Sequence, residues 1–529
     1  MQQLKGHYPM RKPVKLLNYQ APRWDEPLLM EVTSPGERGI LVPKSEEAIL
    51  NTVGSANSLV PKGMLRQAAP DLPELAQPQI VRHFFRLSQM TQGTDVANDI
   101  GGGTCTMKYS PKVNEKLAGL PKAAEIHPDQ DEETMQGTLE IMYKMGEIIK
   151  EITGMDEVSF QPASGSQALL ANSAIVRAYH EDRGNHELKD EVVTSMFSHP
   201  SDAACPSTLG YEINLIMPNK DGVPDMDSFK AAVTESTAAL LICNPEDTGV
   251  YNPKIKEYVK TIHDAGGLCI YDQANANGIL GISRARESGF DLVHLNLHKT
   301  FSSPHGGMGP SCGVIAVTKE LAPYVPVPVV RYNGEKYFLD YNLPKSVGKI
   351  RSYLGSVEVV LRAYAFTMSL GAGGLKQVAE TSVLNNNYLQ KLLLDIKGVS
   401  NPFGDGSGRL QEVRFSLEKL FEDTGVTTED VNRRVIDFGL QSYFESHHPV
   451  LIPEPFTPEP CESYSRYDLE YWAAVMKQVC KEAYENPELV KTAPHNGIVS
   501  KVDDTPMFDD SLSAHTYKQY LKVNAKKES

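Results

Sequence analysis

The 529-residue sequence has little cysteine. Its seven cysteines form an odd set, and none of them makes a C-x-x-C pair or stands at a metal-type spacing from histidine. This pattern excludes a disulfide framework and a zinc site of standard spacing, and it is typical of a protein in a reducing, cytosolic compartment. The sequence therefore predicts no metal centre.

Long hydrophobic runs are also absent. The longest apolar stretches are only a few residues, such as Ala238–Cys243, and Met1–Lys5 does not open the apolar segment of a signal peptide. We therefore expect no membrane association and a cytoplasmic location. A divergent import signal is the alternative.

The sequence contains fewer basic than acidic residues. Lys and Arg number 52 against 67 Asp and Glu, which gives a net charge of −15. A chain that binds the phosphate backbone of nucleic acids needs an excess of positive charge, so this composition argues against that function. The composition is still compatible with binding of a small anionic ligand in a local positive pocket.

What is present is an ordinary globular composition. Hydrophobic residues make up 41% and charged residues 22% of the sequence, and 40 Gly and 35 Pro are spread over loops. At this length we expect two to four domain-sized units, or one large enzyme with appended segments. The predicted division is an extended arm over residues 1–100, a large domain over 101–345, a smaller domain over 346–480 and a tail over 481–529.

The large domain shows the periodicity of an α/β fold. Apolar residues at spacings of three and four predict a helix over Glu133–Ile152, and another long helix follows from Arg362 to Leu393. Between them, short apolar runs alternate with polar turns and helical stretches, which predicts a mostly parallel sheet with crossover helices. The predicted strands are Glu157–Phe160, Glu191–Met196, Ala238–Cys243, Gly267–Tyr271, Asp291–Leu297 and Gly313–Val317.

Ligands of parallel sheets bind just beyond the carboxyl ends of the strands, so the residues after each run are candidates for a site. After the first run, Ser164-Gly165-Ser166 opens a helix whose N–H groups and dipole suit a phosphate, although such a turn more often only caps a helix. After the second run, His199 is placed for an imidazole to lie against an aromatic ligand ring, but a lone histidine is weak evidence.

Polar side chains also follow the third and fourth runs. The Asn244 amide suits a phenolic ligand oxygen, although an Asn-Pro turn is commonly only a loop. Asp272 directly follows the fourth run, with Asn275 three residues later. An acid at this place caps the next helix unless a cationic group needs it.

The fifth run is followed by His298-Lys299-Thr300. A lysine that leaves an apolar strand into a loop rich in Gly, Ser and His is unusual for a solvated charge, and loss of solvent favours imine formation with an aldehyde. A lysine that extends its ammonium group to the surface is the alternative. His298 and His305 are candidates for proton transfer, with loop packing as their alternative.

The order of these residues predicts a pyridoxal phosphate site more strongly than any one of them. The cofactor needs a helix amino terminus for its phosphate, a flat partner for its ring, a carboxylate for its pyridine nitrogen and a lysine for its aldehyde. The predicted catalytic residues are Lys299, His199 and His298. The predicted cofactor-binding residues are Ser164, Gly165, Ser166, His199, Asn244, Asp272, Asn275, Lys299 and Thr300.

Several longer motifs resemble the glycine decarboxylase P-protein of the glycine cleavage system, and within it the lysine-bearing subunit 2 of the two-subunit bacterial form. The resemblance covers most of the chain. Its motifs are Gly103–Lys112, His127-Pro128, Glu133–Gly137, Asp291–Thr300, Pro304–Gly307, Leu339–Tyr341, Pro344–Ser346, Arg362–Tyr364 and Glu485–Leu489.

This resemblance implies an α/β enzyme of fold type I that uses pyridoxal phosphate. Lys299 would form the imine with the cofactor, Asp272 would face its pyridine nitrogen, and His199 takes the place of the histidine in the family's Ser-His-Gly-Thr-Asn motif. Family members release carbon dioxide from glycine and pass the aminomethyl group to the lipoyl arm of the H-protein. The implied partners are therefore glycine, lipoylated H-protein and either a homologous subunit 1 or a second copy in a homodimer.

The chain departs from the family in several loops. The departures are Gln273 for the glycine of Asp-Gly-Ala-Asn, Pro200-Ser201-Asp202 for Gly-Thr-Asn, Glu246-Asp247-Thr248 for Asn-Thr-Leu, Gly101–Thr106 for Pro-Leu-Gly-Ser-Cys-Thr, and Glu459–Tyr464 for Glu-Pro-Thr-Glu-Thr-Glu. We expect the cofactor site to survive these changes. Gln273, Asp202 and Asp247 are the residues that would change the substrate.

Three functions follow from these observations. The first is glycine decarboxylation with transfer to lipoylated H-protein. The second keeps the cofactor but decarboxylates or transaminates another amino acid without H-protein, and carbon dioxide exchange with labelled glycine separates it from the first. The third is a non-catalytic partner subunit, against which the presence of both Asp272 and Lys299 argues.

Overall fold

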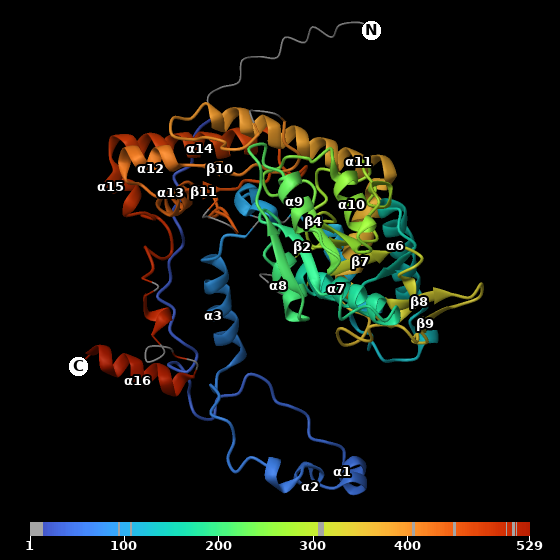
Figure 1. Cartoon of the computed structure of the whole chain (residues 1–529). Helices are drawn as coiled ribbons and strands as arrows, with labels where there is room; N and C mark the ends of the chain where they lie inside the picture. Colours follow the sequence, from blue (N-terminus) through green and yellow to red (C-terminus); the bar gives the residue numbers. More distant parts are fainter. Residues whose placement is uncertain are drawn as a thin grey trace, which may run out of the picture. The chain divides into compact units, whose positions relative to one another are not determined.

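Figure 1 shows the computed structural model of the chain. It describes residues 14–93, 96–105, 108–304, 311–404, 408–447, 451–503, 505–509, 514 and 516–528. The chain divides into two compact units, one from residues 1–18 and 94–493 and the other from Tyr19–Gly93 and Pro494–Ser529. All candidate site residues that the structure describes belong to the first unit.

A seven-stranded sheet is the centre of the first unit. Its strand order is β1-β7-β6-β5-β4-β2-β3. β7 runs antiparallel to both of its neighbours, and every other pair is parallel, so the carboxyl ends of all strands except β7 lie at one edge. The strands are β1 (Glu157–Ser159), β2 (Glu191–Ser195), β3 (Glu212–Ile216), β4 (Thr237–Cys243), β5 (Leu268–Gln273), β6 (Leu292–Asn296) and β7 (Gly313–Val317).

Helices cover both faces of this sheet (Figure 1). Successive side chains of β4 point to opposite faces: Ala239 and Leu241 share a core with α7, whereas Leu240 and Ile242 share a core with α6 and α10. The central strands are therefore buried on both sides, which explains their continuous apolar runs. The helices of this part are α6 (Gln136–Thr153), α7 (Gly165–Asp182), α8 (Ser201–Thr208), α9 (Met226–Ala232) and α10 (Ile255–Asp264).

Helix α6 confirms the periodicity predicted for Glu133–Ile152. Leu139, Met142 and Ile149 are buried on one stripe of the helix. The helix ends at Gly154, whose φ of 74° is left-handed and whose N–H closes the last turn. The methionine-rich stripe is therefore core packing.

Helix α11 (Val357–Leu394) leads from the sheet to a carboxyl-terminal lobe of the same unit, and its helical geometry is interrupted at Gly371, where φ is 63°. Its last turns join a separate apolar core around Trp472. The other elements of the lobe are α12 (Glu418–Thr424), α13 (Thr428–Val435), α14 (Arg466–Glu485), α15 (Pro487–Lys491), β10 (Phe415–Ser416) and β11 (Pro455–Phe456). The first unit also contains α4 (Lys112–Ala118), α5 (Pro121–Ala124), β8 (Val329–Tyr332) and β9 (Tyr337–Asp340).

The second unit consists of short helices and irregular chain. Its helices are α1 (Glu47–Val53), α2 (Ala56–Leu59), α3 (Gln77–Gln89) and α16 (Tyr517–Glu528). The first three contain no buried residue, and Ile40, Leu41 and Val42 are 72%, 78% and 83% exposed. Among the described residues of this unit, few apolar side chains are buried.

The predicted strands are confirmed as β1, β2, β4, β5, β6 and β7, and the long helix ending at Leu393 is confirmed as α11. The sequence did not reveal β3, an edge strand whose side chains are mostly exposed or half-buried and which therefore lacks an apolar run. Across the described residues, no helix combines the length and the apolar character needed to cross a bilayer.

Candidate active site

A cavity lies at the carboxyl edge of the sheet. Its lining comes from the ends of β4 and β5, from the loops after β2, β4, β5 and β6, and from the segment before β10. The lining residues are His199, Cys243, Pro245, Asp247, Asp272, Ala274, Asn275, Lys299, Gln411 and Glu412. The structure thus brings together His199, Asp272, Asn275 and Lys299, four residues that the sequence predicted as parts of one site.

Asp272 is the next-to-last residue of β5, beside Cys243 on β4 and His294 on β6. Its Oδ1 accepts the Ala274 N–H at 2.8 Å and lies 3.2 Å from His294 Nε2. Burial raises the pKa of the Asp272 carboxyl, but the contacts with His294 and the Ala274 N–H outweigh burial and leave the pKa below its usual value. Asp272 is therefore a buried carboxylate at neutral pH.

Lys299 follows β6 after a turn in which the Asn296 carbonyl accepts the Lys299 N–H at 3.2 Å. Only 6% of the residue is exposed. Burial raises the pKa of Glu412 and of Glu459, and the positive charge of Lys299 opposes that rise in both. A buried lysine beside two carboxyl groups is not a lysine extended into solvent, so that alternative is excluded.

Helices α7 and α8 begin close together at the same edge. Ser164 caps α7 by accepting a backbone N–H of the first turn at 3.2 Å, and the hydroxyl oxygens of Ser166 and Ser201 are 2.6 Å apart. A Cβ on Gly165 would lie 2.8 Å from the Asn296 amide, so glycine allows α7 to start against β6. Two helix amino termini and two hydroxyl groups form a suitable place for a phosphate.

His199 presents a fixed ring to the cavity. Its Nδ1 accepts the Ser201 N–H at 3.1 Å, which leaves the proton of the neutral ring on Nε2. The ring packs edge to face against His447, with 4.5 Å between ring centroids and 73° between planes. These contacts set both the orientation and the tautomer of the imidazole.

The two predicted asparagines differ in their surroundings. Asn275 lines the cavity, and its Nδ2 donates to Glu459 Oε1 at 2.5 Å. Asn244 is not among the lining residues, because its Oδ1 accepts the Asn252 N–H at 2.8 Å and its Nδ2 donates to the Asn252 carbonyl at 3.2 Å. The Asn244 amide thus closes its own loop, and the structure does not bring it to the cavity.

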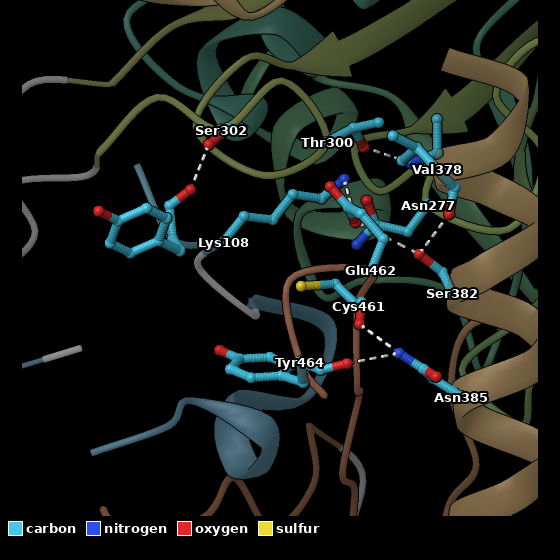
Figure 2. Close-up of polar contacts among 12 residues, drawn as sticks. Lys108, Asn277, Thr300, Ser302, Val378, Ser382, Asn385, Cys461, Glu462 and Tyr464 are labelled. Carbon is cyan, nitrogen blue, oxygen red and sulfur yellow. Dashed lines mark hydrogen bonds and ion pairs between the residues drawn. The ribbon is translucent and has the colours of Figure 1, made fainter. Parts of the chain in front are cut away.

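Thr300 and His298 support the loop around the lysine. Thr300 is fully buried and its Oγ1 accepts the Ala276 N–H at 2.9 Å (Figure 2). His298 Nδ1 accepts the Cys312 N–H at 3.4 Å. Neither residue is among those that line the cavity, and His305 lies outside the described residues.

The wall formed by Gln411 and Glu412 was not predicted. It comes from the carboxyl-terminal lobe, where Asn386 of α11 holds it by donating to the Leu410 carbonyl at 2.9 Å. Burial, and next the nearby charge of Asp247, raise the pKa of Glu412 well above its usual value. The only sequence signal was a polar pair directly before a short apolar run, which does not reveal a contact with a lysine so far away along the chain.

The loop after β4 is fastened to this wall. Asp247 Oδ2 binds Arg414 NH2 at 2.6 Å, with the Arg414 side chain completely buried and that of Asp247 8% exposed. Gly249 of the same loop has a φ of 75°, and a Cβ there would collide with the Glu412 carbonyl. A buried ion pair and a glycine contact therefore set the position of both walls of the cavity.

Figure 2 shows how the loop of residues 459–464 is anchored. Asn385 of α11 donates to the Cys461 carbonyl at 3.0 Å, and Lys108 Nζ lies 2.9 Å from Glu462 Oε2. The Lys108 side chain is completely buried. The loop is thereby tied both to α11 and to the segment before α4.

Glu459 begins this loop and is fully buried. Its Oε1 accepts from the side-chain amides of Asn275 and Asn277 at 2.5 and 2.9 Å. Burial raises the pKa of Glu459 to about 7, against the opposing effects of the two amides and of Lys299. A carboxyl group that titrates near neutral pH therefore lies directly behind Asn275.

A larger cavity, of about 1160 Å³, is formed by α4, α5, α6 and α11. Its lining is mainly apolar, with side chains such as Leu117, Ile141 and Met368, and it contains none of the predicted site residues. Because the lysine and the carboxylate lie elsewhere, the chemistry belongs to the smaller cavity.

The residues of the smaller cavity and its rim provide the chemical groups that pyridoxal phosphate needs. Lys299 provides an amine for an aldehyde, Asp272 provides an ionised carboxylate for a protonated ring nitrogen, and His199 provides a fixed ring in the same cavity. The amino termini of α7 and α8 provide the place for a phosphate. These groups are the donor set that the cofactor needs.

Comparisons with known proteins agree with this fold. A model of the aminotransferase class-V family matches residues 142–344, which contain the whole sheet and Lys299. The solved structure of an inhibitor-bound glycine decarboxylase (P-protein) of the glycine cleavage system is similar with a TM-score of 0.69 and 20% identity, over 83% of this chain and 100% of that one. A cysteine desulfurase from Thermococcus onnurineus gives a TM-score of 0.57 and 16% identity, over 73% and 95%. The fold is that of fold-type I pyridoxal phosphate enzymes.

Curated relatives are similar over nearly the whole chain. The probable glycine dehydrogenase (decarboxylating) subunit 2 of Pyrococcus abyssi is 41% identical over 515 residues, 96% of this chain and 99% of the relative. The protein of the same name from Thermococcus onnurineus is 42% identical over 491 residues, 92% and 95% of the two chains. That from Caldanaerobacter subterraneus is 40% identical over 483 residues, 90% and 96%. The chain therefore belongs to the family of glycine dehydrogenase (decarboxylating) subunit 2.

Proposed function

We propose that this chain is the lysine-bearing subunit of a glycine decarboxylase. With pyridoxal phosphate it releases carbon dioxide from glycine and passes the aminomethyl group to the lipoyl arm of an H-protein. Its stable partner is a homologous subunit 1, or a second copy in a homodimer, and its location is the cytoplasm. The observation that carries the proposal is the single cavity lined by both Asp272 and Lys299 in a chain of this family.

Different residues of the cavity would hold different parts of the cofactor. Pyridoxal phosphate, when bound, supplies the electron sink for the electron pair that a departing carboxyl group leaves behind. Lys299 would hold its aldehyde, and the ionised Asp272 carboxylate would hold a proton at its ring nitrogen. His199 presents an Nε2–H to the same space, since its Nδ1 is occupied by the Ser201 N–H.

Glu412 and Glu459 supply exchangeable protons beside Lys299. Burial raises the pKa of Glu412 well above its usual value and that of Glu459 to about 7, so burial favours the protonated form of Glu412, and Glu459 exchanges its proton near neutral pH. The Lys299 Nζ would exchange protons with its surroundings when the cofactor and the substrate bind. Neighbouring carboxyl groups of this kind are suited to that exchange.

Most of the departures from the family motifs do not line the cavity. Gln273 and Asp202 are buried but are not among the lining residues, and Pro200 is the exposed residue before α8. Asp247 does line the cavity, but its carboxylate binds Arg414. This arrangement supports glycine as the substrate, because few of the changed side chains reach the space where a substrate binds.

Exchange of labelled carbon dioxide into the carboxyl group of glycine tests the proposal. The purified chain, combined with its subunit 1 and lipoylated H-protein, should incorporate label, and Lys299→Ala should not. No incorporation by the loaded wild-type complex would refute glycine decarboxylation.

One observation favours a second candidate, a paralogue that acts on another amino acid without H-protein. Asp247 stands where the family motif has threonine, and it lines the cavity. A screen of amino acids that follows the visible absorbance of the bound cofactor distinguishes the two. A spectral response to glycine favours the decarboxylase, and a response only to a larger or cationic amino acid favours the paralogue.

A further inference from the structure

Two carboxyl groups are buried side by side under the cavity. Asp202, in the first turn of α8, has 0% exposure and Asp272 has 6%. One carboxylate oxygen of each and Cys243 Sγ all lie within 4.8 Å of one another. Asp202 stands where the family motif has asparagine, and an asparagine there would not form such a pair of acids.

Two adjacent buried carboxylates repel each other strongly, because little water screens their charges. One of the two therefore keeps its proton, as in other pairs of buried acids that share one charge. The titratable groups facing the pair from the surrounding elements are His199, Cys243, Glu246, Asp247 and His294.

The contacts show which acid is ionised. Asp272 accepts the Ala274 N–H at 2.8 Å and has His294 Nε2 at 3.2 Å. Asp202 Oδ2 accepts from the weak donor Cys243 Sγ at 3.9 Å, and Asp202 Oδ1 has no hydrogen-bond partner in the part of the chain that the structure describes. The backbone donor from Ala274 favours the charge on Asp272, and the lack of a comparable donor favours the proton on Asp202. Burial, and next the charge of Asp272, raise the pKa of Asp202 well above its usual value, in agreement with the contacts.

We propose that Asp202 is a protonated carboxylic acid that donates its hydrogen to the Asp272 carboxylate and thereby positions it. The pair then presents one negative charge, which matches one proton on a cofactor ring nitrogen. A protonated carboxyl group and an amide both place a donor at the end of a short side chain. Asp202 can therefore offer Asp272 the same donor that an asparagine at this motif position would offer. The inference rests on the role proposed above for Asp272.

The two carboxylate oxygens and Cys243 Sγ could instead bind a divalent metal. Within the cluster Cys243 Sγ donates to Asp202 Oδ2, and Asp272 Oδ1 accepts the Ala274 N–H, so these atoms already have hydrogen-bond partners. These contacts favour a shared proton over a metal. Metal analysis of the purified holoenzyme should find no bound divalent ion, and one equivalent per chain would overturn the proposal.

The first test is infrared spectroscopy of the full chain without cofactor at pH about 7. The wild-type spectrum minus that of Asp202→Asn should contain the carbonyl stretch of a protonated carboxylic acid. A difference spectrum that shows the loss of an ionised carboxylate instead would overturn the proposal. This measurement involves neither glycine nor H-protein, so its failure is distinct from a failure of the proposed function.

The second test compares two substitutions in their affinity for pyridoxal phosphate. Asp202→Asn keeps a donor toward Asp272 and should bind the cofactor within about threefold of wild type, whereas Asp202→Ala removes the donor and should bind about tenfold more weakly. Equal affinities of the two variants would overturn the positioning role. If Asp202→Ala does not fold, the infrared difference and the affinity of the folded Asp202→Asn variant still decide the matter.

Discussion

Asp272 and Lys299 reach the same cavity from neighbouring strands. Asp272 pairs in register with His294 on β6, and Lys299 follows that strand after a single turn. Because β5 and β6 are parallel, both side chains emerge at the same edge of the sheet. The relative position of the acid and the amine is therefore set by strand register and not by a mobile loop.

Asp272→Asn should separate cofactor binding from catalysis. The amide cannot hold a proton on the ring nitrogen, so the decarboxylation rate should fall about 100-fold, equivalent to ~3 kcal/mol in the activation barrier. The visible absorbance of the bound cofactor should persist because Lys299 is intact. Stopped-flow absorbance and carbon dioxide exchange measure the two effects, and an unchanged exchange rate would argue against the role of Asp272.

Asp247→Asn should destabilise the fold by leaving the Arg414 guanidinium buried without its anion. Breaking one partner of a completely buried ion pair costs about 3 kcal/mol, and we expect a clear decrease in the thermal-unfolding midpoint. The matched control is Asp264→Asn, which breaks the exposed Lys260–Asp264 pair. That change should leave the midpoint almost unaltered. Equal decreases in the unfolding midpoint for the two substitutions would show that the buried ion pair stabilises the fold no more than the exposed one.

Gly249→Ala should disturb the contact between the loop after β4 and the Glu412 segment. The new Cβ meets the Glu412 carbonyl in addition to the strain of a φ of 75°, so we expect a loss of about 2 kcal/mol or more. Gly184→Ala is the control, since Gly184 has a φ of 68° and a Cβ added there would have nothing within 4 Å. A smaller decrease in the unfolding midpoint for Gly184→Ala isolates the cost of the collision.

Glu246→Gln should change how stability depends on pH. Burial raises the pKa of Glu246 from 4.5 to about 8, although Ser195 Oγ donates to its Oε2 at 2.6 Å. Between these values the folded chain holds a proton that the unfolded chain has lost, so this group's contribution to stability is complete below pH 4.5 and disappears as the pH rises through about 8. The amide of the variant cannot ionise.

The expected result is that wild type loses more stability than Glu246→Gln between pH about 5 and about 9. Thermal unfolding at a series of pH values measures both curves. Parallel curves for the two proteins would mean that Glu246 ionises normally in the folded chain.

The sequence predicted the sheet well, because strands buried on both faces need continuous apolar runs. It also predicted that Asp272 and Lys299 share a site, since the carboxyl ends of parallel strands meet at one edge. It missed β3, because an edge strand needs no apolar run. These predictions depended on the local pattern of apolar residues and on the general rule that ligands bind at the carboxyl ends of parallel strands.

The rest of the site depends on contacts that no local pattern reveals. Gln411 and Glu412 come from the carboxyl-terminal lobe, and contacts with α11 and with the loop after β4 place them beside Lys299. Asn244 had the right position in the sequence, but its amide is used to close its own loop. The neutral state of Asp202 likewise depends on burial beside Asp272, which a sequence does not show.

The central claim is that Lys299 is the amine that carries pyridoxal phosphate, and the most direct measurement is reduction of the loaded protein with borohydride followed by peptide mapping. Reduction fixes the cofactor to the amine that held it. We predict one pyridoxyl group per chain, on Lys299, and none in Lys299→Ala. A label on another lysine in the wild type, or the same amount of label in the variant, would contradict this claim.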